Sequence, residues 1–203
     1  MYIFDNKITI ENRDVLEEYL NGYEYETSGL SFSALYMWRD INEFCFEIIG
    51  DYMCISGISH LELDQKLNFM FPPLTKTGSY DSGLLRETIL EAKRIFESKG
   101  AVFNLRLVPE HMTQLICEAA PEIEFSEDRP NFDYIYRRED LVELRGKKYH
   151  AKKNYINSFK KNYEYEYEPI NSGMADELME FIEFFNGRKE IPEHEMELLK
   201  NEE

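Results

Sequence analysis

The sequence predicts an α/β protein of the α+β kind, in which a mixed central sheet is flanked by helices. The first observation is a pair of β-rich runs at residues 43–49 and 52–58, joined by Gly50-Asp51 as a short hairpin. The second is the order of the elements that follow, in which strands and helices alternate, at 67–71, 81–99, 101–108, 109–119 and 132–136. This alternation favours helices packed on one sheet.

The helix over residues 81–99 has the clearest pattern. Its apolar residues recur at helical spacing and are Leu85, Ile89, Ala92 and Phe96. Gly100 follows where left-handed backbone geometry ends many helices. The stripe therefore predicts one buried helix face.

The remaining segments extend the prediction to both ends of the chain. A helix at 11–21 ends at Gly22, and one at 30–38 begins behind Ser28 or Gly29. Further helices are predicted at 147–161, 173–186 and 193–203. Residues 163–168 alternate tyrosine and glutamate, which is typical of a half-buried strand.

Composition limits the class of protein. The 203 residues are 43% hydrophobic, enough for one globular domain, or one domain plus a fragment. The three cysteines form no CxxC motif, and His194 among flexible glutamates is a poor metal site, so we expect neither disulfides nor a bound metal. No signal peptide or membrane span is apparent, which predicts a cytoplasmic location.

The charge is distributed unevenly. The net charge of −17 argues against general nucleic-acid binding. Residues 145–161 nevertheless contain seven cations and no acid, and taking these from the chain's 23 leaves 16 cations against 40 acids. One basic element in an otherwise acidic protein indicates an anionic ligand.

As a helix, this basic element has two faces. Its aromatic side chains gather on one side, while lysines, amides and a histidine gather on the other and suit a phosphate group. We predict His150 as general base, because neighbouring lysines favour its neutral form. The predicted substrate-binding residues are Arg145, Lys147, Lys148, Lys153, Asn154, Asn157 and Lys161. Two alternatives stay open: a solvated helix face, or internal pairing with the acidic 164–168 segment.

The run from Phe132 to Asn162 resembles the signature of a known family. It contains Asp-Tyr-Ile-Tyr, an acidic Glu-Asp-Leu turn, Gly-Lys-Lys-Tyr-His and Lys-Asn-Tyr-Ile-Asn. These residues are similar to the C-terminal domain of bacterial phosphatidylglycerol lysyltransferases and their uncharacterised relatives. Residues 32–38 and the Phe71-Pro-Pro-Leu run add support.

The resemblance implies a GNAT-like fold, that of acyl-CoA N-acyltransferases, present as two tandem domains. We expect a first domain at 1–144, a basic connecting helix at 145–162 and the start of a second domain at 163–203. In that family an aminoacyl group passes from aminoacyl-tRNA to a lipid or similar acceptor, in a cleft between the domains. Because this chain has only part of the second domain, we expect it to be inactive alone.

No cofactor is evident from the residues. The Gly-rich loop that holds acetyl-CoA is missing, and its nearest equivalent, 76–83, is explained by turn and cap chemistry. Acyl-CoA and aminoacyl-tRNA are the candidate donors, and the candidate partners are a phosphate-bearing small molecule, a lipid headgroup or a tRNA end. The competing interpretation is a non-catalytic scaffold or a dimerisation domain, which makes a homodimer a further candidate.

Overall fold

The computed structural model describes residues 2–22, 27–62 and 65–187. They fall into two units, residues 2–132 and residues 133–187. The helix predicted at 193–203 and the histidine at position 194 lie outside the described residues. The units are described separately, as unit 1 and unit 2.

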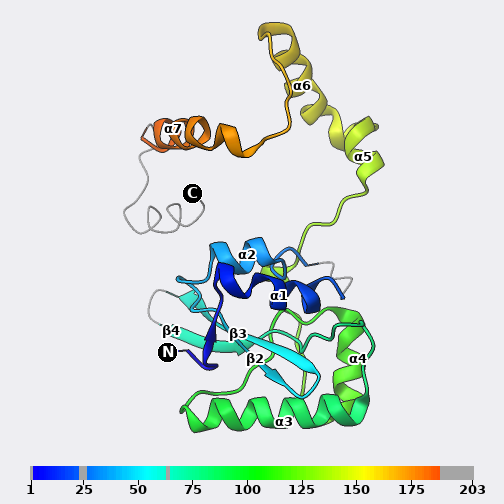
Figure 1. The fold of residues 1–203 in the computed structure, drawn as a ribbon. Helices are drawn as coiled ribbons and strands as arrows, with labels where there is room; N and C mark the ends of the chain where they lie inside the picture. The colour runs from blue at the N-terminus through cyan, green and yellow to red at the C-terminus, as the bar shows by residue number, and fades with distance from the viewer. Residues whose placement is uncertain (1, 23–26, 63–64, 188–203) are drawn as a thin grey trace. The chain divides into compact units, whose positions relative to one another are not determined.

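Unit 1 is built on an antiparallel sheet in which neighbouring strands follow each other along the chain (Figure 1). Its strands are β1 (Asn6–Lys7), β2 (Cys45–Ile49), β3 (Tyr52–Glu62) and β4 (Gln65–Met70). The predicted hairpin is confirmed, since Ile49 pairs with Tyr52 across a turn in which Gly50 has φ +60°. A positive φ at this position suits glycine.

Helices cover both faces of this sheet. They are α1 (Arg13–Leu20), α2 (Phe32–Met37), α3 (Ser82–Ser98) and α4 (Glu110–Ala119). Figure 1 shows α1 and α2 on one side of the sheet and α3 on the other. The cap of α2 is Ser31, whose Oγ accepts from Ala34 N at 3.2 Å, so the predicted start behind Ser28 or Gly29 was wrong.

The apolar stripe of α3 is buried as predicted. Leu85 and Ile89 join the main core, which spans the sheet and helices α1 to α4. Farther along α3, Ala92 and Phe96 belong to a second cluster that also contains Ile3, Phe4, Cys45, Cys54 and Met70. The N-terminal segment therefore packs between the sheet and the end of α3.

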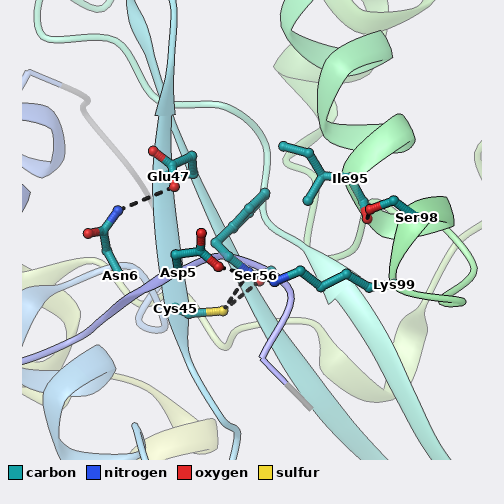
Figure 2. Close-up of polar contacts among 9 residues, drawn as sticks. Asp5, Asn6, Cys45, Glu47, Ser56, Ile95, Ser98 and Lys99 are labelled. Carbon is teal, nitrogen blue, oxygen red and sulfur yellow. Dashed lines mark hydrogen bonds and ion pairs between the residues drawn. The ribbon is translucent and has the colours of Figure 1, made fainter.

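Polar contacts fasten the same N-terminal segment (Figure 2). Lys99 Nζ lies 3.2 Å from Asp5 Oδ1, and Asn6 Nδ2 donates to Glu47 Oε2 at 3.3 Å. On β2, Cys45 Sγ lies 3.1 Å from Ser56 Oγ. Charged contacts between exposed side chains contribute little stability. The second apolar cluster therefore contributes most to holding the N-terminal segment in place.

The strand predicted at 101–108 was wrong. This segment meets β4 in parallel at one bridge, Met70 to Leu105, through the bonds Met70 N to Asn104 O and Arg106 N to Met70 O. At Leu107 φ reaches +55°, which turns the chain out of an extended path. The expected mixed sheet is therefore antiparallel in its named strands, and the observed class is α+β.

The side chain of Arg106 joins three parts of unit 1. It donates to Ser59 Oγ at 2.7 Å and to Asp128 Oδ2 at 2.5 Å, and Asn131 Nδ2 donates to the same carboxylate at 3.0 Å. These hydrogen bonds hold the pKa of Asp128 below its ordinary value. Asp128 therefore stabilises the fold in its charged form.

This lowered pKa gives a pH-dependent prediction. Because the folded pKa lies below the unfolded value of about 3.9, the stabilisation is present above that pH and is lost as pH falls through the folded value. We expect Asp128→Asn to lower the free energy of unfolding by up to about 1 kcal/mol near neutral pH. Urea titrations should show this difference shrinking as the pH falls below about 4, the unfolded pKa. Glu124→Gln, an exposed control, should show no such trend.

The thiols of Cys45 and Cys54 are buried, whereas Cys117 is exposed. Burial, together with the charge of Glu47, raises the pKa of Cys54 well above its ordinary range. Since the thiolate is the reactive form, we expect a thiol-specific reagent to modify one cysteine in the folded protein and three after denaturation. Rapid modification of all three in the folded protein would contradict this burial.

Unit 2 contains helices joined by segments without regular secondary structure. Its helices are α5 (Arg138–Glu143), α6 (His150–Asn162) and α7 (Ala175–Asn186). The strands predicted at 132–136 and 163–168 were wrong, because neither segment forms a strand or pairs with one among the described residues. Their tyrosines stay exposed, and Tyr167 is 93% exposed. The predicted burial of one tyrosine face does not occur.

Candidate functional site

The predicted helix at 147–161 is confirmed as a short 3-10 turn, Lys147–Tyr149, that leads into α6. We call residues 145–162 the basic segment. Leu144, just before this segment, and Gly146, its second residue, take positive φ values of 46° and 89° and redirect the chain ahead of the helix. The 3-10 turn begins without a side-chain cap, so its first backbone N–H groups are available to an anion. At the start of α6, Tyr149 N and His150 N already donate to Gly146 O and Lys147 O.

Five of the predicted site residues share one face of this helix. They follow each other at alternating steps of three and four residues: Lys147, His150, Asn154, Asn157 and Lys161. Lys153 lies at the edge of this face. Every residue of α6 is exposed, so the face is open to solvent among the described residues.

Two predicted residues are instead engaged by neighbouring acids. Arg145 Nε lies 3.1 Å from Glu143 Oε2, and Lys148 Nζ lies 3.3 Å from Asp140 Oδ2. Hydrogen bonds to the side chains of Tyr149 and Asp140 raise the pKa of Lys148. These two cations are partly neutralised by α5, which a count of charges within 145–161 could not show.

The other cations of the predicted site keep their charge available. Lys147, Lys153 and Lys161 form no ion pair with any residue that the structure describes. His150 is exposed and has no side-chain hydrogen bond within the described residues. Its role as general base stays a prediction.

The aromatic side of the basic segment is also exposed. Phe159 stacks on Tyr163 with ring centroids 5.1 Å apart and contacts Tyr165 at 5.2 Å. Tyr155 is 77% exposed, while Tyr149, in the turn before α6, is buried. An aromatic helix face of this size normally packs against protein.

A second candidate lies in unit 1, where a groove of about 660 Å³ separates the end of α1, the β2–β3 turn and the loop before α3. Its walls are Tyr19, Asp51, Tyr52, Thr75, Lys76, Thr77, Ser79, Tyr80, Asp81 and Leu84. The predicted cap chemistry of the loop is confirmed, since Asp81 Oδ1 accepts from Leu84 N at 2.9 Å. Sequence reasoning missed the hairpin and α1 residues of this groove, because only folding brings them to the loop.

Neither candidate resembles a metal centre. Over residues 2–22, 27–62 and 65–187, no three histidine, cysteine or acidic side chains gather closely enough to hold an ion. Within the same residues, no helix has both the length and the apolar character needed to cross a bilayer.

The chain is similar to a protein whose structure has been solved. A conserved protein of unknown function from Bacteroides thetaiotaomicron VPI-5482 has a crystal structure that matches with a TM-score of 0.72 and 27% sequence identity. The match covers 94% of this chain and 63% of that one, so this chain spans less than two thirds of that protein's length. No curated protein matches.

A family model accounts for most of the chain. The model of the phosphatidylglycerol lysyltransferase C-terminal region matches residues 21–199, which include the groove residues from Asp51 onward and the whole basic segment. The chain belongs to the phosphatidylglycerol lysyltransferase C-terminal family.

Proposed function

We propose that this protein acts in acyl or aminoacyl transfer, and that its basic segment holds a phosphate-bearing donor or acceptor against a second GNAT-like domain. The family supports this reaction class, since phosphatidylglycerol lysyltransferases are named for the transfer of lysyl groups to phosphatidylglycerol. Acyl-CoA and aminoacyl-tRNA are the donors this reaction class admits. A lipid headgroup or a tRNA end supplies the phosphate.

The proposal includes the domain organisation expected from the family. Residues 1–144 form the first GNAT-like domain, 145–162 the connecting helix and 163–203 the beginning of the second domain. Two observations support the incomplete second domain: the exposed aromatic face of α6, and the segment from Tyr163, which pairs with no strand among the described residues. A helix of 13 residues that is exposed throughout among the described residues is marginally stable in water, so we expect added protein to cover it.

The observation that carries the proposal is the set of cations on the basic segment that have no acidic partner among the described residues. Lysines on an exposed helix normally alternate with glutamates at i,i+4 spacing, which gives each charge a neighbour. Here Lys147, Lys153 and Lys161 lack such neighbours among the described residues, and amides at Asn154 and Asn157 stand between them. Charge with directed hydrogen-bond donors is the chemistry of phosphate recognition.

We expect replacement of Lys147, Lys153 and Lys161 by glutamine to weaken phosphate-ligand binding at least tenfold. Each substitution removes a cation that attracts the ligand, and glutamine keeps the helix propensity. The ligands to titrate are acetyl-CoA, glycerophosphoglycerol and an aminoacyl-tRNA, at low and at high salt. Added salt should weaken binding to the natural chain more than binding to the variant.

A control variant separates the site from net charge. Lys7→Gln, Lys93→Gln and Arg94→Gln remove the same charge from unit 1 and should leave binding unchanged. Equal weakening by both triple variants would show that overall charge, and not the basic segment, governs binding. Unchanged binding in the α6 variant would reject the proposed site.

The exposed aromatic face favours a second candidate function, a non-catalytic scaffold or dimerisation domain. In that case substitutions on α6 change stability or self-association and leave ligand binding intact. Tyr155→Ser with Phe159→Ser tests this alternative. Sedimentation should then show a lower association state, with phosphate binding unaffected.

A further inference from the structure

We propose that the groove of unit 1 binds a primary alkylammonium group. This inference is independent of the basic segment, because the groove is built from α1, the β2–β3 turn and the loop before α3. Its volume of about 660 Å³ accommodates a small ligand or the end of a longer one. What the groove can bind depends on which polar groups of its wall already have partners.

The charge that remains in the groove is negative. Asp51 lies in the exposed hairpin turn and makes no hydrogen bond or ion pair with a described residue. Asp81 uses Oδ1 to cap α3, which leaves its other oxygen as an acceptor. The cation of the wall is Lys76, and its Nζ lies 2.5 Å from Glu18 Oε2. The Lys76–Glu18 pair has no net charge, so Asp51 and Asp81 leave the groove with a net negative charge.

The same contacts argue against an anion. A helix N-terminus attracts anions because its first N–H groups lack partners. At α3 the carboxylate of Asp81 already occupies this position. The hydrogen bond to Glu18 raises the pKa of Lys76 and keeps it as the partner of that acid. An incoming phosphate would meet two carboxylates without a free cation among the described lining residues.

The buried wall contains an unsatisfied polar group. Thr75 is 5% exposed and lines the groove, and its Oγ1 has no hydrogen-bond partner within the described residues. Buried hydroxyl groups are nearly always paired, and an unpaired one at a cavity wall marks a place where a ligand donor or water completes the contact. Thr75 and the two aspartates all accept hydrogen bonds.

The rest of the wall suits an alkyl chain. Tyr80 is half-buried and stacks on Tyr52 with centroids 5.8 Å apart, and its hydroxyl donates to Pro73 O at 2.9 Å. Leu84 adds an exposed apolar surface beside it. A protonated primary amine places three N–H donors among the acceptors while its methylene groups lie on Tyr80 and Leu84.

Amide shifts of the isotopically labelled full chain test this assignment. The probes are n-butylammonium, tetramethylammonium and inorganic phosphate, with spermidine and Nα-acetyl-lysine to distinguish a polyamine from an amino-acid side chain. We expect saturable shifts at Asp51, Thr75 and Ser79 with n-butylammonium. Tetramethylammonium should bind at least tenfold more weakly, because it has the charge and no N–H donor.

Two variants locate the ligand. Asp51→Asn keeps a turn-forming residue and should weaken n-butylammonium binding at least tenfold, whereas Glu124→Gln removes the same charge elsewhere and should not. Thr75→Val removes the unpaired hydroxyl, so it should weaken binding without lowering the thermal stability of the ligand-free protein. If the Thr75 hydroxyl were only structural, Thr75→Val would lower the thermal stability and leave n-butylammonium binding unchanged.

Three results would overturn the proposal. They are no saturable shift with any amine, equal binding by Asp51→Asn and the natural chain, and phosphate shifts at the same amides in place of amine shifts. If the spermidine and Nα-acetyl-lysine titrations both saturate, the compound with the lower dissociation constant identifies the source of the amine. Failure of phosphate binding at α6 leaves these outcomes unchanged.

Discussion

Replacing Phe96 with alanine is expected to lower the free energy of unfolding of unit 1 by about 3–5 kcal/mol. Phe96 is fully buried near the end of α3 and makes edge contacts with Phe4 and Phe103, at centroid distances of 6.1 and 5.3 Å. Removing its ring leaves a cavity that three separate segments line. The N-terminal segment then loses the main apolar surface that holds it.

Urea unfolding followed by Trp38 fluorescence measures this effect, since the chain has one tryptophan and it lies in unit 1. Leu84→Ala is the matched control, because Leu84 is 44% exposed on the same helix and should cost less than 1 kcal/mol or so. Similar losses for the two variants would show that the smaller cluster does not contribute as its burial indicates.

Replacing Gly22 with alanine is expected to destabilise unit 1 by roughly 2–3 kcal/mol and to displace the loop before α3. A Cβ at this position would lie 2.0 Å from the backbone oxygen of Lys76. Backbone cannot move aside as a side chain does. The loop would shift and carry Thr75 and Tyr80 away from their positions in the groove.

Thermal unfolding and the amine titration should both detect this change. Gly29→Ala is the control, because a Cβ there meets nothing within 4 Å. Gly29→Ala should leave the amide shifts of the groove intact, whereas Gly22→Ala should abolish them. Normal stability of Gly22→Ala would mean that the loop does not approach α1 this closely.

Much of unit 1 was predictable because its elements carry local signals. The apolar stripe of α3 and the Gly50-Asp51 hairpin depend on spacing within a few residues, and both are confirmed. The segment at 101–108 has the composition of a strand, yet Leu107 turns it away after one parallel bridge. Strand propensity shows that the side chains suit a strand. It does not show that a neighbouring strand is in place to pair with the segment.

In the candidate sites too, the features with local signals could be predicted and those that depend on the folded chain could not. The helix of the basic segment could be predicted from its period, and five of its residues share a face as expected. The ion pairs of Arg145 and Lys148 with α5 could not, because they depend on how the chain turns at Leu144 and Gly146. The groove was missed for a related reason: Asp51 and Thr75 are 24 positions apart in a sequence that gives no sign of their approach.

The full exposure of α6 has a consequence for how tightly any ligand binds there. A helix that is exposed throughout among the described residues exchanges with unfolded forms, so only a fraction of molecules present the phosphate-binding face at a given moment. The measured dissociation constant equals the intrinsic one divided by that fraction. Anything that covers the aromatic side of α6 would raise the helical population and tighten binding on the opposite side, without touching the ligand itself.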